Sequence, residues 1–155
     1  MKKVTLCFCL KNDHVLLAMK KRGFGAGKWN GYGGKVDGGE QPSTAAVREL
    51  KEESGIAAEV DALRQVGHIS FYFEEVPFFE CYVYTIQVWQ NDPVETSEMK
   101  PKWFPVEDLP FAEMWAADIQ LVPMVLKSKS IQAEVHYNAD GSVLEDFSYR
   151  SVKFV

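Results

Sequence analysis

Apolar and polar side chains alternate along the first segment of the chain. Between Val4 and Leu10 the large apolar residues fall on every second position, and a second apolar run spans residues 15–19. A period of two is typical of a β-strand with one face in the core. The Lys-Asn-Asp sequence at positions 11–13 is typical of a turn. The pattern therefore predicts a β-hairpin at the start of the chain.

Apolar segments later in the chain predict further strands. Residues 67–73 and 79–89 are rich in Tyr, Phe and Val, and a Glu-Glu-Val-Pro segment at 74–77 separates them. Residues 103–104 indicate a short strand that ends at a proline. The Asp-Gly pair at 140–141 lies between two alternating segments, which is a typical hairpin signal.

A helix is predicted over residues 44–54. Ser43 and Thr44 are good N-cap candidates behind a proline, and Gly55 suits the left-handed residue that ends a helix. A second helix is predicted over residues 114–127, bent or interrupted near its internal proline. Strands mixed with two helices indicate an α/β fold in which helices cover a mixed sheet.

Three carboxylates lie close together on the first of these helices. Glu52 and Glu53 follow Glu49 by three and four positions, so the three share an arc of about 100°. Like charges at this spacing repel each other, and a divalent cation such as Mg²⁺ would relieve the repulsion and bridge to substrate phosphates. Such an ion also neutralises a diphosphate before water attacks phosphorus. The pattern favours metal-dependent phosphate chemistry.

Arg48 and Glu40 are expected to support these acids. Arg48 lies four residues before Glu52 and can hold it by a charge-assisted hydrogen bond, while Glu40 can brace Arg48 from the preceding turn. An acidic run on a helix is more often a solvated face. Here the full spacing, the preceding glycines and the cap signals occur together, which favours a functional site.

The segment from Gly34 to Ile56 carries one complete motif: Gly, five residues, Glu, seven residues, Arg-Glu-aliphatic, one residue, Glu-Glu, one residue, Gly-aliphatic. This pattern resembles the box of the Nudix hydrolases at every defining position. The resemblance implies a Nudix α-β-α sandwich with a mixed sheet and a metal-dependent pyrophosphohydrolase activity. It implies Mg²⁺ as the cofactor, with Mn²⁺ as the alternative.

The likeness extends to residues 20–36, 98–104 and 110–115, which resemble the animal-type oxidised purine nucleoside triphosphatases, the 8-oxo-dGTP diphosphatase (MutT-homologue) branch. It implies hydrolysis of 8-oxo-dGTP, with 2-hydroxy-dATP as a second substrate candidate, to the monophosphate and pyrophosphate, which sanitises the nucleotide pool. The implied metal ligands are Glu49, Glu52, Glu53, Glu98 and the main-chain carbonyl of Gly33. The implied catalytic residues are these four glutamates and Arg48, and the general base is left open between Glu53 and Glu98.

Substrate contacts are also implied by this resemblance. Lys20 would contact phosphate, Asn30 would hydrogen-bond the base and Trp115 would stack on it. Aromatic residues of this kind are more often simple core residues. The remaining pocket residues would be Thr5, Phe24, Phe71, Phe73, Asp118 and Tyr137.

One departure from this branch bears on the base. The branch carries two adjacent aspartates that read the Watson-Crick edge, whereas this chain has Ala117 followed by Asp118. A lone ionised Asp118 accepts hydrogen bonds only, which favours 8-oxoguanine over 2-hydroxyadenine. This argument favours one base, but the sequence alone leaves the preferred base open.

Two other functions are weighed. A Nudix hydrolase of another nucleoside diphosphate derivative, such as ADP-ribose, is the alternative among the enzymes. A ligand sensor without catalysis belongs to a different class, but such domains typically lose glutamates of the box and gain a DNA-binding domain, and neither change is seen in this sequence.

Composition and charge narrow the partners. The chain has 155 residues and no break in composition, so one domain spanning residues 1–155 is expected. A net charge of −5 disfavours a nucleic-acid polymer and is compatible with a small nucleotide bound through metal. No apolar run approaches the ~20 residues of a membrane span, and the three cysteines lack metal-site spacing. We expect a soluble, cytoplasmic monomer with reduced cysteines that binds no membrane.

Overall fold

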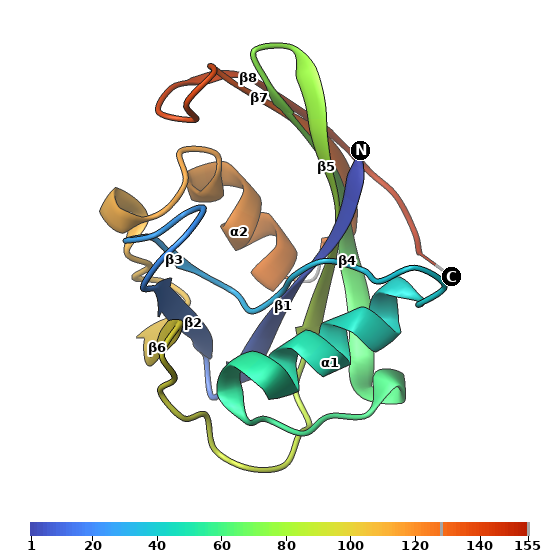
Figure 1. Ribbon diagram of the computed structural model, residues 1–155, viewed down its shortest axis with the longest axis vertical. Coiled ribbons are helices and arrows are strands. Elements are labelled where there is room, and N and C mark those ends of the chain that lie inside the picture. The colour runs from blue at the N-terminus through green and yellow to red at the C-terminus, as the bar shows by residue number, and fades with distance from the viewer. Residues whose placement is uncertain (128, 155) are drawn as a thin grey trace.

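The computed structural model describes residues 1–127 and 129–154 (Figure 1). Its helices are α1 (Pro42–Ser54) and α2 (Asp118–Leu126), and two short 3-10 turns, η1 (Val60–Ala62) and η2 (Phe111–Glu113), precede β4 and α2. Its strands are β1 (Lys2–Lys11), β2 (His14–Lys20), β3 (Trp29–Asn30), β4 (Leu63–Phe73), β5 (Val76–Ile86), β6 (Met99–Pro105), β7 (Ile131–Tyr137) and β8 (Leu144–Ser151).

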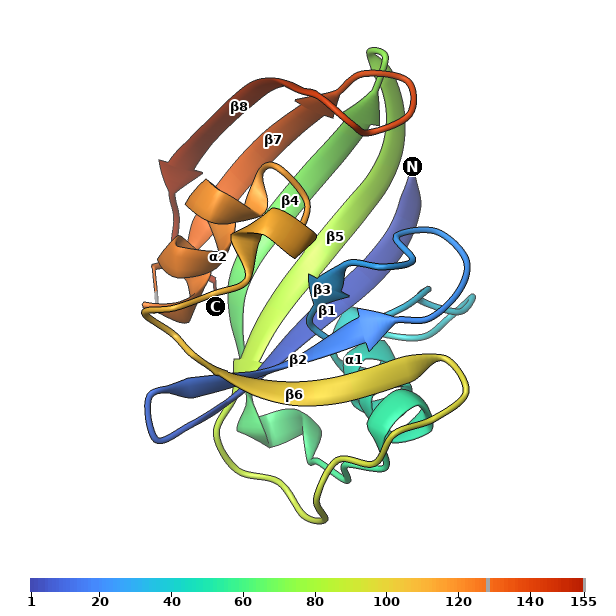
Figure 2. The same cartoon turned by 90° about the vertical axis from the view of Figure 1, so that its left-hand side faces the viewer.

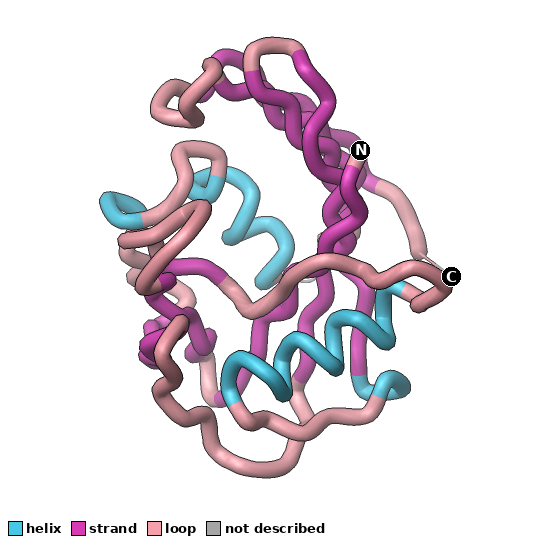
Figure 3. Tube along the Cα trace, viewed as in Figure 1, coloured by secondary structure: helices cyan, strands magenta, loops and turns pink. Residues whose placement is uncertain are grey.

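The strands form one mixed sheet in the order β3-β2-β1-β5-β4-β7-β8, with β6 pairing along β2 (Figure 2). β1 with β5 and β4 with β7 run parallel, and the other neighbours run antiparallel. α1 and α2 lie on opposite faces of the sheet, as the tube in Figure 3 makes clear. The predicted α/β class, with a mixed sheet between helices, is confirmed.

Each helix packs on its own apolar core, because neighbouring residues of a strand point to opposite faces. On β2, Leu17 joins the core under α2, and Leu16 joins the core under α1. Leu121 contributes to the first core from α2, and Leu50 to the second from α1. The three cysteines are buried and form no disulfide, as expected.

Several strands are longer than the sequence indicated, whereas the strand predicted at 79–89 lies at 76–86 as β5. A tight turn joins β4 and β5. Only Glu74 and Glu75, both with positive φ, separate these two strands of eleven residues. The predicted separator at 74–77 is therefore wrong, since pairing continues to Val76. The strand predicted at 103–104 extends over all seven residues of β6, because β6 pairs along the whole of β2. The N-terminal hairpin of β1 and β2 forms as predicted.

The helix α1 begins at Pro42, two residues earlier than predicted, and its N-cap is Gln41 instead of Ser43 or Thr44. Proline suits the first turn because its missing N–H has no partner there and its φ is already helical. The helix ends as predicted at Gly55, whose φ of 81° is left-handed and whose N–H donates back to the last turn.

The helix α2 begins at Asp118, four residues later than the predicted start at 114. Met114 is extended, with a φ of −128°, and the Asp118 carboxylate accepts the N–H of Trp115 at 3.1 Å. This bond holds a turn where a helix was predicted. The helix then runs through Pro123 without interruption, because proline removes only one of its hydrogen bonds. No helix in the described residues is long and apolar enough to cross a membrane.

Candidate active site

A cavity of about 350 Å³ lies on the face of the sheet that α2 covers. Gly33, the expected metal ligand, is part of its wall. The chain reaches the cavity from β1, β2, β4, β7, the start of α2 and the loops around β3, so only the folded chain brings these residues together. All residues that the sequence placed around a substrate line it: Thr5, Lys20, Phe24, Asn30, Phe71, Phe73, Trp115, Asp118 and Tyr137.

Trp115 is the centre of an aromatic cluster at one end of the cavity. Its ring stacks on Phe24, with centroids 5.2 Å apart and planes at 28°, and it meets Phe73 edge-on at 6.4 Å. Tyr137 lies 5.5 Å away, and the Lys28 ammonium lies 5.2 Å from the indole centroid. Flat apolar faces edged by one cation suit a planar ring of a ligand.

Asp118 is a buried acid at this end of the cavity. Burial is the largest influence and raises the pKa of Asp118 to about 7, while the Trp115 N–H and the charge of Lys28 act in the opposite direction. Both protonation states of Asp118 are therefore accessible near neutral pH. This differs from the permanently ionised Asp118 that sequence reasoning assumed.

Ala117 and Asn30 are two further positions that the sequence analysis connected with the base. Ala117, at the position of the absent second aspartate, is buried in the core under α2, and its N–H donates to the Tyr137 hydroxyl at 3.1 Å. The side-chain oxygen of Asn30 accepts the N–H of Gly31 at 2.8 Å, which orients the amide in the cavity wall. The side chain at position 117 is therefore packed in the core, whereas Asn30 lines the cavity.

The acidic face of α1 meets the cavity at Gly33. Oε1 of Glu53 accepts the Gly33 N–H at 3.1 Å. Burial and then the charge of Glu49 raise the pKa of Glu53 to about 7, whereas the Gly33 hydrogen bond and Lys20 lower it. A Cβ on Gly34 would lie 2.5 Å from Cδ of Glu49. The two glycines therefore let the loop approach the acids of α1 closely.

Arg48 ties α1 to the loop that precedes it. Its Nε and Nη2 donate to the two oxygens of Glu40 at 2.9 and 3.0 Å, a bidentate pair that lowers the pKa of Glu40. Nη1 donates to Glu49 at 3.0 Å and to Glu52 at 3.3 Å, and Nη2 donates to the carbonyl of Lys35 at 2.9 Å. The two predicted contacts, Arg48 with Glu52 and Arg48 with Glu40, are both present.

Glu98 lies on the loop before β6 and not on α1. Its carboxylate pairs with Arg22 at 3.1 Å, yet its charge still contributes to the raised pKa of Glu53. Within residues 1–127 and 129–154, no three Asp, Glu, His or Cys side chains converge closely enough to hold a metal ion. The cations that contact these acids are Arg22 and Arg48.

The donor set nevertheless suits a hard divalent cation. The charge of Glu49, one helical turn from Glu53, raises the pKa of Glu53, and carboxylate and carbonyl oxygens are the ligands that Mg²⁺ prefers. The oxygen donors available here are the carboxylates of Glu49, Glu52, Glu53 and Glu98 and the carbonyl of Gly33.

Sequence reasoning missed several residues in and around this site. Arg22 and Lys28 lie in a basic loop directly before the motif, and that run of charge was the available signal. Phe79 lines the cavity and meets Phe24 edge-on at 5.6 Å, but it was read only as part of a strand. Gly141 contacts Trp115 from a distant hairpin, and no local pattern indicates that contact.

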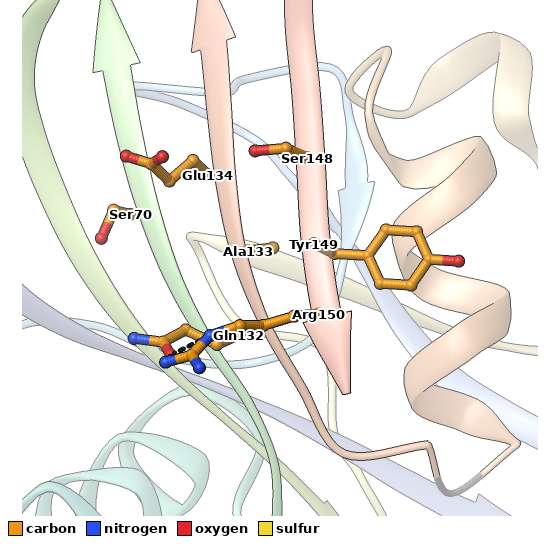
Figure 4. Close-up of a pocket in the computed structure, with 7 residues that line it drawn as sticks. All are labelled: Ser70, Gln132, Ala133, Glu134, Ser148, Tyr149 and Arg150. Carbon is orange, nitrogen blue, oxygen red and sulfur yellow. Dashed lines mark hydrogen bonds between the residues drawn. The ribbon is translucent and has the colours of Figure 1, made fainter. Parts of the chain in front are cut away.

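A second hollow, of about 370 Å³, lies on the sheet where β4, β7 and β8 run side by side (Figure 4). Its wall is polar, with Ser70, Glu134 and Ser148, and Arg150 donates to the side-chain oxygen of Gln132. Tyr149 is directed away from these side chains (Figure 4). The predicted site residues do not line this hollow. The aromatic cavity is therefore the candidate active site.

The chain matches the NUDIX domain model over residues 1–125. It belongs to this family and is a Nudix hydrolase. Hydrolases of the family generally need divalent metal ions, which agrees with the carboxylates on α1 and their contact with the loop at Gly33.

Two vertebrate proteins are similar to nearly the whole chain. The oxidized purine nucleoside triphosphate hydrolase of Danio rerio is 41% identical over 145 residues, which cover 93% of this chain and 92% of that protein. The protein of the same name from Mus musculus is 42% identical over 149 residues, which cover 96% and 94%. The human diphosphoinositol polyphosphate phosphohydrolase 3-alpha is 34% identical over 115 residues, covering 69% and 66%. Relatives with different named substrates thus share the family.

Solved structures agree on the fold. The crystal structure of the "mMutator MutT protein" from Bacillus halodurans superposes with a TM-score of 0.84 and covers 96% of this chain and 97% of that one. The sequence identity is 24%, so the likeness speaks for the architecture alone.

Proposed function

We propose that the protein is a Mg²⁺-dependent pyrophosphohydrolase that converts oxidised purine nucleoside triphosphates to the monophosphate and pyrophosphate. The observation that carries this proposal is the hydrogen bond from Gly33 to Glu53, because it joins the aromatic cavity to the acidic face of α1. A nucleotide whose base occupies the cavity would then extend its phosphates toward the carboxylates of α1. The similarity to the two vertebrate hydrolases over more than nine tenths of each chain supports this substrate class.

Base recognition is assigned to the end of the cavity that holds Trp115. The indole offers a flat face, and the Asn30 amide has both donor and acceptor capacity. An ionised Asp118 accepts from the N1–H and amine of an oxidised guanine, and a protonated Asp118 donates to a ring nitrogen of an adenine edge. With a pKa of about 7, one carboxyl group serves both edges. We therefore assign both 8-oxo-dGTP and 2-hydroxy-dATP as substrates.

The phosphate end is assigned to Lys20 and the acids of α1. Lys20 lines the cavity and lies close enough to Glu53 to lower its pKa, so its ammonium is placed to bind a phosphate oxygen. A bound Mg²⁺ neutralises the charge of the phosphates. It would be held by Glu49, Glu52, Glu53, Glu98 and the carbonyl of Gly33.

Glu53 is assigned as the general base that accepts the proton of the attacking water. Glu98 already pairs with Arg22, whereas Glu53 sits half-buried beside the cavity wall with one oxygen held by Gly33. Arg48 orients the remaining acids, because its Nη1 donates to both Glu49 and Glu52.

A polyphosphorylated inositol suits this cavity poorly. Such a ligand needs a cluster of cations around every phosphate, whereas the far end of the cavity holds aromatic rings and the buried acid Asp118. A nucleotide presents a planar base to that end and its charge to the other. Of the substrate classes named for the relatives, nucleotides therefore suit this cavity better than inositol polyphosphates do.

A substrate panel tests the proposal. The protein with Mg²⁺ is assayed against 8-oxo-dGTP, 2-hydroxy-dATP, dGTP and ADP-ribose, and pyrophosphate and nucleoside monophosphate are quantified. We expect the two oxidised triphosphates to have the highest kcat/KM and to release pyrophosphate. A higher kcat/KM for ADP-ribose, or release of orthophosphate in place of pyrophosphate, would refute the proposal. Glu53→Gln serves as the matched inactive protein.

We further propose that the protein acts as a cytoplasmic monomer on the free nucleotide pool. Its net charge of −5 disfavours binding to nucleic-acid polymers, which supports a small-molecule substrate. Light scattering at assay concentration and fractionation of cells test the two points, and a stable dimer or a membrane-associated fraction would contradict them.

A further inference from the structure

Gly141 is a buried residue in a hairpin tip whose neighbours are exposed. Asp140 before it and Ser142 after it both face solvent, although all three belong to the turn between β7 and β8. Its φ of 77° lies in the left-handed region that favours glycine. In Figure 1 this turn, at the red end of the colour scale, projects from the sheet on the side where α2 lies.

The backbone of Gly141 rests against the edges of two rings of the candidate site. A Cβ built on it would lie 2.7 Å from Cζ3 and 3.4 Å from Cη2 of Trp115, and 3.1 Å from Cε1 of Phe73. Real Cβ atoms do not approach other atoms as closely as 2.7 Å, so any side chain at position 141 has to displace the indole. The tip of the hairpin thus packs behind two rings, those of Trp115 and Phe73, that line the cavity.

The hairpin tip is held in place by its own hydrogen bonds. Oδ1 of Asp140 accepts the N–H of Ser142 at 3.0 Å and also its hydroxyl at 2.6 Å. Asn138 donates to the Ser142 hydroxyl and accepts the N–H of Val143, each at 3.0 Å. The N–H of Gly141 donates to the carbonyl of Asn138 at 3.1 Å. The hairpin tip that packs against Trp115 and Phe73 is therefore held in one conformation by its own hydrogen bonds.

Trp115 itself lacks the support of a regular element. It lies between η2 and the first residue of α2, where its backbone is held only by a turn: its N–H donates to the Asp118 carboxylate at 3.1 Å and its carbonyl accepts the Asp118 N–H at 2.9 Å. On its other side, a Cβ on Gly25 would come within 3.6 Å of Nε1, and Phe24 stacks on its ring. Two glycine-containing loops therefore flank the indole, in addition to its contacts with Phe73 and Tyr137.

We propose that Gly141 is a positioning residue for Trp115 and that the tip of the β7–β8 hairpin sets the width of the slot for a purine base. This inference rests on the proposed function, in which the base stacks on Trp115. A side chain at position 141 narrows the slot and moves the indole, while the acids of α1 at the other end of the cavity are untouched. Binding of the nucleotide is the property that position 141 governs.

The test uses Gly141→Ala in the full-length protein. Steady-state kinetics with 8-oxo-dGTP give kcat and KM, and ¹⁹F NMR of protein labelled with 5-fluorotryptophan reports each indole. The resonance of Trp115 is the one that Trp115→Phe removes. Gly39→Ala is the control for backbone strain, because Gly39 has a φ of 81° with no atom within 4 Å of a Cβ, and its unfolding midpoint gives the cost of strain alone.

We expect Gly141→Ala to shift the Trp115 resonance and to leave the other three in place. KM should rise roughly tenfold while kcat falls less than about threefold, because binding and not chemistry is disturbed. Trp115→Phe lacks Cζ3 and Cη2, so adding Gly141→Ala to it should raise KM less than about twofold further, the non-additivity expected of residues in contact.

The outcomes separate this inference from the proposed function. If the unmodified protein does not hydrolyse 8-oxo-dGTP, the proposed function fails, and the Trp115 resonance still tests the positioning. If Gly141→Ala keeps both KM and the Trp115 resonance, the inference is overturned. If Gly141→Ala does not fold but the double variant with Trp115→Phe does, the contact is supported. If neither folds, backbone strain alone explains Gly141 and the inference is overturned.

Discussion

The N–H of Gly33 donates to Oε1 of Glu53 at 3.1 Å, and this bond links the wall of the aromatic cavity to the acidic face of α1. Gly33 has no room for a side chain, because a Cβ there would lie 1.7 Å from the carbonyl oxygen of Thr5 on β1. The loop is thus pressed between β1 and α1. Backbone packing therefore fixes the position of the cavity wall relative to the acids of α1.

Replacing Glu53 by Gln tests the assigned base. The substitution keeps the shape of the side chain and its acceptor oxygen for Gly33, but removes the charge and the proton-accepting group. We expect kcat to fall roughly 10²-fold or more with the fold intact, measured by pyrophosphate release and circular dichroism. Glu145→Gln, at an exposed position of β8, is the control and should keep full turnover. Near wild-type turnover of Glu53→Gln would exclude this role.

Replacing Arg48 by Lys tests the brace between α1 and its loop. Lysine keeps one charge but cannot donate to both oxygens of Glu40 while also reaching Glu49 and Glu52. We expect the unfolding midpoint to fall by roughly 2–4 °C and kcat to drop. Arg150→Lys on the polar hollow is the matched control. If both variants lost the same stability and kept full turnover, Arg48 would be an ordinary surface residue.

The burial of Asp118 predicts a pH-dependent stability. Its pKa is raised to about 7 in the folded protein from an ordinary value of 3.8, so between these values the folded state keeps a proton that the unfolded chain has lost. The stabilising contribution is complete below about pH 4 and is lost as the pH rises to about 7. Asp118→Asn keeps an acceptor for Trp115 and cannot ionise.

Urea unfolding at pH 5, 6, 7 and 8 measures this effect. The stability of Asp118→Asn relative to the unmodified protein should increase from pH 5 to about 7 and level off above it. A difference that stays constant over this range would mean that Asp118 ionises in the folded state as readily as in the unfolded chain.

The same carboxyl group predicts a pH-dependent choice of substrate. Protonated Asp118 donates to an adenine edge and ionised Asp118 accepts from a guanine edge. The ratio of kcat/KM for 2-hydroxy-dATP to that for 8-oxo-dGTP should therefore rise as the pH falls through about 7. Taking the ratio cancels pH effects on the shared phosphate chemistry. In Asp118→Asn the ratio should no longer change with pH, and an unchanged slope in that variant would assign the effect to another group.

Restoring an acid at position 117 is expected to destabilise the protein. Ala117 is buried in the apolar core under α2, so Ala117→Asp places a carboxylate among apolar side chains. We expect the unfolding midpoint to fall by roughly 5 °C or more, and further at higher pH, where the acid ionises. Ala116→Asp, at the exposed neighbouring position, is the control and should be nearly neutral. Equal midpoints for the two variants would place the side chain at position 117 in solvent.

Local patterns were enough for the parts of the site that depend on one helix and its turn. The spacing of Glu49, Glu52 and Glu53 puts them on one face of any α-helix, and Arg48 reaches Glu52 because they are one turn apart. The left-handed residue that ends α1 was likewise visible as Gly55. The N-cap was not, because Pro42 competes with Ser43 and Thr44 for the first turn and sequence alone does not rank them.

The sequence by itself thus determined an acidic helix with its bracing arginine, and the set of residues that line the aromatic cavity. Only the tertiary structure decided the environment of each group. The pKa of Asp118 depends on how completely the α2 core excludes water, the pairing of Glu98 with Arg22 depends on two loops meeting, and the contact of Trp115 with Gly141 depends on a distant hairpin packing over the site. The spacing of residue types along the sequence reflects contacts within one helix or between neighbouring strands. Burial and contacts between distant segments arise only when the whole chain has packed.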